Sequence, residues 1–289
     1  METSEILKRV RQIEIKTKGL SQNIFAGQYH TAFKGKGMAF SEVREYGFGD
    51  DIRNIDWNVT ARFNHPYIKV FEEERELTVM LLIDVSGSRL FGTRNKHKHE
   101  MLTEIAATLA FSAIQNNDKI GVIFFSDKLE KFIPPQKGKK HILYIIRELV
   151  DFQPKNTGTD IGFALKYMTG VIKKRCTAFV LSDFIDNKPF QTDLTIANNK
   201  HDLVAIQVYD QRETALPDVG LMTILDAETG MSSSIDTSSV KTREAYRLWW
   251  KNQQDMVQDS FKKSRVDFVS VATDQDYVKA LMNLFNLRN

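Results

Sequence analysis

One strand that ends on polar side chains is the feature that most constrains the fold of this chain. Its sequence, LTVMLLIDVSGS, covers residues 77–88. The run from Leu77 to Ile83 is apolar apart from one threonine, and Asp84, Ser86 and Ser88 follow it. An apolar run of this length is typical of a strand that is covered on both faces, as in a parallel sheet. The carboxylate and the two hydroxyls indicate either a turn bonded to its own backbone or a binding site.

Strand and helix patterns alternate along the rest of the chain. Apolar residues recur at helical spacing over residues 97–116. Further helices are expected over residues 139–150, 159–174, 239–264 and 274–288. Strands are expected over residues 119–127, 177–184, 202–210 and 266–273. The alternation predicts an α/β fold with a Rossmann-like, mostly parallel sheet and helices on both faces.

Two segments depart from this alternation. Residues 1–75 begin with a short helical pattern and continue into a glycine- and aromatic-containing stretch that predicts short strands and turns. Residues 219–237 predict a hairpin, with its turn near Glu228, inserted before a long helix. The chain is therefore expected to have an N-terminal helix and β-rich segment, 1–75, packed on a main domain of residues 76–289.

The charge balance and the cysteine count exclude several functions. The chain has 40 Lys and Arg against 37 Asp and Glu, a net charge of +3, which gives no electrostatic reason to expect nucleic acid or a membrane surface as partner. The one cysteine, Cys176, permits no internal disulfide and is interpreted as a buried, inert thiol. No apolar run approaches the roughly 20 residues of a membrane-spanning helix. A cytoplasmic chain is expected, with any association with membrane proteins made through partners.

Two more polar residues are expected at the edge of the sheet where Asp84 lies. Thr159 begins a helix in TGTDIG, and Asp183 ends a strand in VLSDF. Ligands of open parallel sheets bind beyond the carboxyl ends of the strands, where the strand order reverses. With Ser86 and Ser88 these residues supply two carboxylates and three hydroxyls, an all-oxygen set that suits Mg²⁺. A position left open on the ion could accept an acidic side chain of another protein.

The DVSGS sequence resembles the Asp-x-Ser-x-Ser signature of von Willebrand factor A-type domains, which carry a metal-ion-dependent adhesion site. In that family the two serines and a downstream threonine contact the metal, and the acids act mainly through water. The resemblance implies a site for Mg²⁺, or for Mn²⁺ or Ca²⁺. It implies as metal ligands Asp84, Ser86, Ser88, Thr159 and Asp183, with Thr157 as the alternative to Thr159.

A second resemblance covers nearly the whole chain. The stretches GKGMAFSEVREYGFGDDIRNIDWNVTAR, YIKVFEEERELTVMLLIDVSGS and LPDVGLMTILDAETG resemble the bacterial family called domain of unknown function 58. Members of that family resemble A-type domains with an added N-terminal segment. They are commonly associated with MoxR-type AAA+ ATPases, and a chaperone-like or assembly role is proposed for them. The resemblance implies a MoxR-type ATPase, or a client of that ATPase, as the partner.

Four further residues are candidates for contact with a partner: Arg89, Asp160, Arg53 and Trp57. Arg89 stands where relatives often carry an apolar residue, and it could weaken metal binding, hold an acidic partner or point into solvent. Arg53 and Trp57 lie in GFGDDIRNIDW, which is interpreted as a turn braced by Asp–Arg bonds with Trp57 in a small core, or else as a partner surface. The HKH at residues 97–99 is interpreted as a solvated helix start.

The patterns favour a non-enzymatic, metal-dependent protein-binding module. An alternative is a metal-dependent hydrolase or phosphotransferase on a similar sheet. Phosphoaspartate enzymes need a second acid two residues after the first, where this chain has Ser86, and a lysine placed near the phosphate. No Ser-His-Asp or Cys-His set is evident in the sequence. A scaffold whose metal site is silent is the third interpretation.

Overall fold

A computed structural model of the chain describes residues 37–74, 77–90 and 97–288. They belong to two compact units, a small one over Phe33–Leu77 and a large one that includes Thr78–Asn289. The division between the units lies two residues from the expected boundary at 75. The short helix expected near the N-terminus lies outside the described residues.

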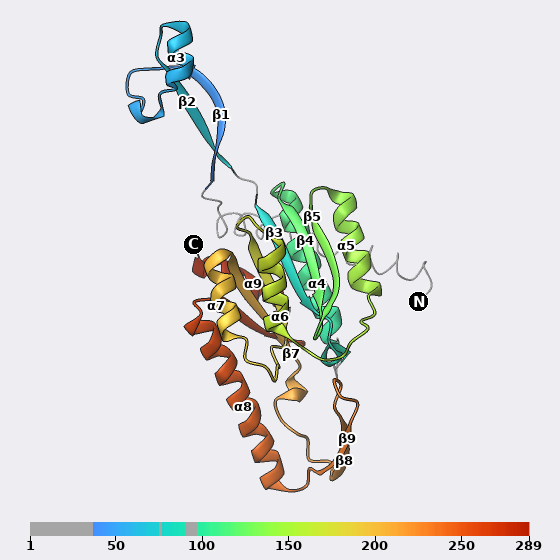
Figure 1. The fold of residues 1–289 in the computed structure, drawn as a ribbon. Coiled ribbons are helices and arrows are strands. Elements are labelled where there is room, and N and C mark those ends of the chain that lie inside the picture. The colour runs from blue at the N-terminus through green and yellow to red at the C-terminus, as the bar shows by residue number, and fades with distance from the viewer. Residues whose placement is uncertain (1–36, 75–76, 91–96, 289) are drawn as a thin grey trace. The chain divides into compact units, whose positions relative to one another are not determined.

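The small unit is an antiparallel pair of strands with helical segments in the connection (Figure 1). Strand β1 (Gly37–Glu45) pairs with β2 (Tyr67–Glu74). The connection holds a 3₁₀ turn, η2 (Ile52–Asn54), and helix α3 (Trp57–Phe63).

Helix α3 corrects the prediction of only strands and turns in this stretch. The helix begins because the Asp56 carboxylate accepts hydrogen bonds from the amides of Asn58 and Val59. It ends at Asn64, whose φ of 55° is the left-handed conformation that stops a helix. Seven residues make only two turns, too few for a helical period to stand out in the sequence.

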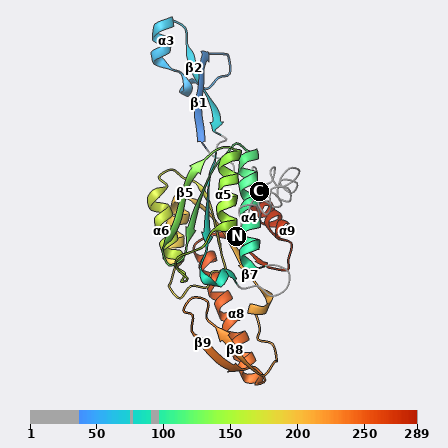
Figure 2. The same ribbon diagram turned by 90° about the vertical axis from the view of Figure 1, so that its right-hand side faces the viewer.

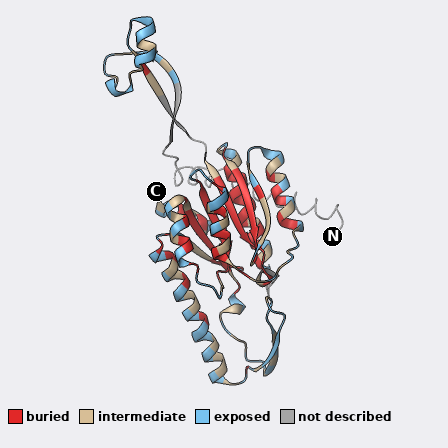
Figure 3. Cartoon of the chain, in the orientation of Figure 1, coloured by how far each residue is buried: buried red, intermediate tan, exposed pale blue. Residues whose placement is uncertain are grey.

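The large unit is built on a six-stranded sheet with the order β10-β7-β6-β3-β4-β5. All neighbouring strands in it run parallel except β4 and β5, which are antiparallel. The strands are β3 (Thr78–Asp84), β4 (Lys119–Phe125), β5 (Leu129–Gln136), β6 (Thr177–Ser182), β7 (Asp202–Tyr209) and β10 (Asp267–Ala272). The predicted mostly parallel α/β sheet is confirmed, and its central strands are the most deeply buried part of the chain (Figure 3).

Helices cover both faces of this sheet, as predicted (Figure 2). One face carries α4 (Lys98–Gln115), α5 (Lys139–Asp151) and α9 (Tyr277–Arg288). The other carries α6 (Ile161–Val171), α7 (Gln191–Lys200) and α8 (Val240–Lys263). On this second face, Leu82 of β3 packs in one apolar cluster with Leu165 of α6 and Phe261 of α8. None of the helices in the described ranges combines the length and the apolar character that crossing a bilayer requires.

Two elements of the large unit were missed by the sequence analysis. Strand β5 contains Pro134 and Pro135, which weaken the strand pattern but are tolerated because β5 is the last strand at one edge of the sheet. Helix α7 is mostly polar, and among its apolar residues only Leu194 and Ala197 are buried, so its period is weak.

The strand order reverses between β3 and β6, which lie side by side although β4 and β5 come between them in the sequence. After β3 the chain adds strands on one side, and from β6 onward it adds strands on the other side. The carboxyl ends of β3 and β6 therefore flank the switch point where ligands of such sheets bind. The inserted hairpin is present as β8 (Leu221–Leu225) and β9 (Ser232–Asp236).

We expect Gly121→Ala to lower the free energy of unfolding by about 1–3 kcal/mol, because a Cβ on this β4 residue would overpack the core. The added atom would lie 2.8 Å from the carbonyl oxygen of Ile133 and 2.9 Å from the sulfur of Met80. Gly170→Ala in α6 is the control, since nothing lies within 4 Å of its Cβ position. It should be neutral or stabilising by up to about 1 kcal/mol. Urea unfolding of both variants measures the two free energies. Equal changes in the two variants would contradict the close packing around Gly121.

Candidate metal centre

Asp84 is the last residue of β3, and its carboxylate is 3% exposed. One oxygen, Oδ1, accepts a hydrogen bond from the amide of Ser86 at 2.9 Å. The other, Oδ2, accepts the hydroxyl of Ser182, the last residue of β6, at 2.6 Å. The Ser182 oxygen in turn accepts the amide of Phe184 at 2.9 Å. These bonds join the ends of the two strands at the switch point and fix the orientation of the Asp84 side chain.

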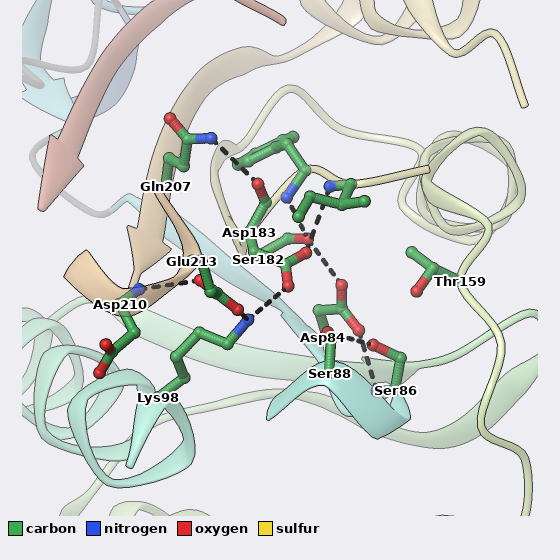
Figure 4. A network of polar contacts seen from close by, with 12 residues as sticks. Asp84, Ser86, Ser88, Lys98, Thr159, Ser182, Asp183, Gln207, Asp210 and Glu213 are labelled. Atoms are coloured by element: carbon green, nitrogen blue, oxygen red, sulfur yellow. Dashed lines mark hydrogen bonds and ion pairs between the residues drawn. The ribbon is translucent and has the colours of Figure 1, made fainter. Parts of the chain in front are cut away.

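The two serines of the signature lie on the 3₁₀ turn η3 (Gly87–Leu90) or directly before it. Their hydroxyl oxygens are 3.2 Å apart, and Ser86 is fully buried. The amide of Gly87 donates to the carbonyl of Thr157 at 2.9 Å, which ties this turn to the loop before α6. Both hydroxyls are therefore held beside Asp84 (Figure 4).

Asp183 follows β6 and is 5% exposed. Its Oδ2 pairs with the Lys98 ammonium at 2.8 Å, and its Oδ1 accepts the amide of Ile185 at 3.2 Å. The same ammonium pairs with Glu213 Oε1 at 2.5 Å. The Asp183 carbonyl accepts the side-chain amide of Gln207 at 3.0 Å. Asp183 is thus held from both sides by groups on other elements (Figure 4).

Thr159 faces Asp84 and Ser86 from the loop before α6 (Figure 4). The residue is 7% exposed, and its hydroxyl donates to Glu228 Oε1 at 2.6 Å. Thr157 is exposed, and its hydroxyl donates to the backbone carbonyl of Glu228 at 2.6 Å. Of the two threonines, Thr159 is the buried residue and lies in the group around Asp84 (Figure 4).

The acids of this group repel one another. Burial, together with the negative charge of Asp183, raises the pKa of Asp84 to about 6, although the bonds from Ser182 and Ser86 oppose the shift. Burial also raises the pKa of Glu228, and the charge of Asp183 adds to that shift. Burial opposes the charge on Lys98, but Asp183 and Glu213 outweigh it and raise its pKa.

The donor set fits a hard divalent cation. Its oxygens are hydroxyls and carboxylates from the β3 loop, the end of β6 and the loop before α6. A cation would also relieve the repulsion that raises the pKa of Asp84. Within the described ranges, no three or more His, Cys, Asp or Glu residues gather so that they could hold a metal by themselves. A metal at this place would therefore depend on the serine and threonine hydroxyls.

Among the other candidate residues, Asp160 makes contacts with residues outside this group. Asp160 caps α6 by accepting the amide of Phe163 at 2.7 Å, and it pairs with Lys188 at 2.6 Å. Arg89 lies in η3, and its side chain is outside the described part. Arg53 and Trp57 belong to the small unit.

In the small unit, the Asp–Arg bracing is present and the predicted core is wrong. Arg53 pairs with Asp51 at 2.7 Å, and Arg44 pairs with Asp50 at 2.7 Å. Trp57 is 71% exposed, so it does not lie in a small core as predicted. The first turn of α3, where Trp57 lies, contains no residue that the structure describes as buried.

Four residues of the site were not recognised from the sequence: Ser182, Lys98, Glu213 and Glu228. Lys98 lies in the HKH that was interpreted as a solvated helix start, but it is only 1% exposed. The position of Ser182, one residue before the predicted ligand Asp183, was a usable signal. The glutamates are distant in sequence from the other members, and no local pattern marks them.

The chain is similar to several known proteins. A family model described as "Protein of unknown function DUF58" matches residues 42–256. An uncharacterized protein of Mycobacterium tuberculosis is 26% identical over 271 residues, which make up 93% of this chain and 85% of that protein. Among solved structures, the conserved hypothetical protein BatB from Bacteroides thetaiotaomicron has a TM-score of 0.50 and 16% identity, covering 73% of this chain and 98% of that one. The VWA domain of SpRpn10 has a TM-score of 0.39 and 12% identity, covering 73% and 95%.

We expect Asp84→Asn to stabilise the protein at pH 7 when a chelator is present. Folding raises the pKa of this carboxyl from 3.8 to about 6, so the folded state binds the proton more tightly and wild-type stability falls as the pH rises from about 4 to 6. The amide cannot ionise, and the gain at pH 7 should be about 1–3 kcal/mol, shrinking towards zero near pH 4.

Urea unfolding at the two pH values measures this difference. Asp255→Asn on α8, at an exposed position, is the matched control and should change neither value. A variant that is less stable than the wild type at pH 7 would contradict the repulsion between the buried acids.

Proposed function

This chain belongs to the DUF58 family of proteins of unknown function, and we propose that it is a non-enzymatic protein-binding module that acts through a divalent metal ion. The proposal rests on one observation. Asp84, Ser86, Ser88, Thr159 and Asp183 come from three separate stretches of the sequence and lie together at the switch point of the mostly parallel sheet. Carboxylates and hydroxyls gathered in this way are the ligands that Mg²⁺, Mn²⁺ or Ca²⁺ prefers.

The hydroxyls of Ser86, Ser88 and Thr159 would contact the metal, and Asp84 and Asp183 would hold it directly or through water. The bound ion would supply positive charge that a carboxylate of another protein can share. Neighbouring side chains keep the acids in place before any partner arrives. The Ser182 hydroxyl orients Asp84, and the Lys98 ammonium, which is also paired with Glu213, orients Asp183. Such buried pairs are costly to break, at about 3–5 kcal/mol when one partner is removed.

The partner is proposed to offer an acidic residue to the metal. The resemblance described above supports a MoxR-type AAA+ ATPase, or a client of that ATPase, in complex assembly or chaperone-like work. A cytoplasmic location is in keeping with the buried state of Cys176, the only cysteine. Arg89, Arg53 and Trp57 stay candidates for contact with the partner, and the exposure of Trp57 favours such a role.

A hydrolase or phosphotransferase is less well supported by the geometry. Its second acid would stand at the position of Ser86, which is a buried hydroxyl here. The one lysine of the group, Lys98, is paired with Asp183 and Glu213 and so is already engaged. Metal-dependent binding without turnover accounts better for hydroxyls at these positions.

We expect Ser86→Ala to weaken Mg²⁺ binding by about ten- to a hundredfold, because even outer-shell partners of metal sites contribute that much. The fold should persist, since only one oxygen is lost. Calorimetric titration gives the affinity, and circular dichroism checks the fold. Ser260→Ala on α8 is the control and should bind as the wild type does. Equal affinity in Ser86→Ala would reject the site, and a wild type that binds no divalent ion would favour the silent scaffold.

Capture of partners should depend on the metal. We expect a MoxR-type ATPase or its client to be recovered with the wild-type chain in Mg²⁺ and to be lost on adding a chelator or in Asp84→Asn. This variant is expected to be at least as stable as the wild type, so a loss would report the site rather than unfolding. Mass spectrometry of the two eluates measures the difference, with Ser260→Ala again as control. The same proteins at the same yield in every sample would count against a metal bridge.

A further inference from the structure

The tip of the β8–β9 hairpin is attached to the candidate metal centre. Glu228 is held at two points, its carboxylate by the Thr159 hydroxyl and its carbonyl by the Thr157 hydroxyl, both at 2.6 Å. Beside it, Ala227 lies against Gly87. A Cβ placed on Gly87 would come within 2.2 Å of the Ala227 carbonyl oxygen. The backbone of the hairpin tip therefore lies directly on the serine turn of the DVSGS sequence.

The turn that carries Glu228 is internally bonded. The Asp226 carboxylate accepts the amide of Glu228 at 2.8 Å and the amide of Thr229 at 3.2 Å. The amide of Gly230, whose φ is +71°, donates to the Asp226 carbonyl at 2.8 Å. These bonds fix the backbone of the turn from which the Glu228 side chain reaches Thr159.

The hairpin strands bury little apolar surface. Leu221 is 76% exposed and Leu225 is 66% exposed, and Met231 beside the turn is 72% exposed. An element with few buried apolar contacts opens at a low cost in free energy. The polar contacts at the tip are thus a large part of what holds the hairpin against the serine turn and the loop before α6.

The Glu228 carboxylate accepts the hydroxyl of Thr159, one of the candidate ligands, and so lies beside the proposed metal position. The same carboxylate lies within electrostatic reach of Asp183 and is partly withdrawn from water. Like charges at such a place repel, whereas a divalent ion among the same oxygens would attract all of them. A carboxylate against the Thr159 hydroxyl is also the group that the proposed partner would bring.

We propose that Glu228 is an internal acidic ligand of the metal centre, and that the hairpin tip covers the position that the carboxylate of a partner would take. This inference rests on the proposed function. It makes metal binding and hairpin docking mutually reinforcing, because each supplies a contact that the other needs. It also makes hairpin docking and partner binding exclusive, so a partner engages the metal only when the tip has moved away.

The test compares Glu228→Gln with Glu244→Gln in the full chain. The amide of Glu228→Gln can still accept the Thr159 hydroxyl, so the substitution isolates the charge. Glu244 is exposed on α8 and serves as the matched control. We expect Mg²⁺ affinity in calorimetry to fall about tenfold or more in Glu228→Gln alone. Hydrogen exchange of residues 226–231 should slow on adding Mg²⁺ in the wild type and in Glu244→Gln, but not in Glu228→Gln.

A second experiment tests whether the position covered by Glu228 can bind a carboxylate from solution. In Glu228→Ala the position is vacated, so millimolar acetate should raise the Mg²⁺ affinity of this variant and leave that of the wild type unchanged. Acetate without effect on Glu228→Ala would overturn the inference.

The outcomes separate the two proposals. Equal Mg²⁺ affinity in the wild type and Glu228→Gln, with hairpin exchange indifferent to the metal, would overturn the internal ligand and leave the metal centre standing. A wild type that binds no divalent ion would overturn both.

Discussion

Two carboxylates, Asp84 and Asp183, are buried within electrostatic reach of each other because they end or follow strands that are neighbours in the sheet. The two carboxylates repel each other, and other residues of the site offset that repulsion. Lys98 neutralises Asp183 from α4, and Ser182 donates its hydroxyl to Asp84. Glu213 pairs with the same lysine, so the ammonium does not cancel the whole negative charge. The remaining deficit of positive charge is what a divalent cation would supply.

The main features of this arrangement could be predicted from the sequence, because they follow from local patterns. The apolar run of β3 and its polar end predicted the position of Asp84, and the alternation of elements predicted a parallel sheet whose switch point brings Asp183 and Thr159 near. Local patterns do not reveal contacts between distant segments. Lys98 looked like one of three polar residues at a helix start, and its burial is due to Asp183 and Glu213. Trp57 looked like a core residue, but the small unit leaves it exposed.

The hairpin is a second case in which a contact between distant segments could not be predicted from the sequence. Its turn near Glu228 was predicted from the residues that favour turns, but no local pattern indicates that this turn reaches the serine loop. The turn residues that shape the hairpin, Asp226 and Gly230, also fix the backbone from which the Glu228 carboxylate reaches Thr159. A segment that looks like an insertion between a strand and a long helix is therefore part of the site. In the proposed scheme, the oxygens of the metal centre would face either Glu228 of the hairpin or the carboxylate of a partner, but not both at once.

Gly87 has a further consequence for how such a protein can diversify. Its missing side chain is what allows the Ala227 backbone to approach the serine turn so closely. A single methyl group added at Gly87 would push the hairpin tip away from the serine turn, and both serine hydroxyls would remain. A change of this size could thus shift the balance between a docked and an undocked hairpin. A substitution at this one position would therefore change how readily the proposed site opens, without any change to the residues proposed to hold the ion.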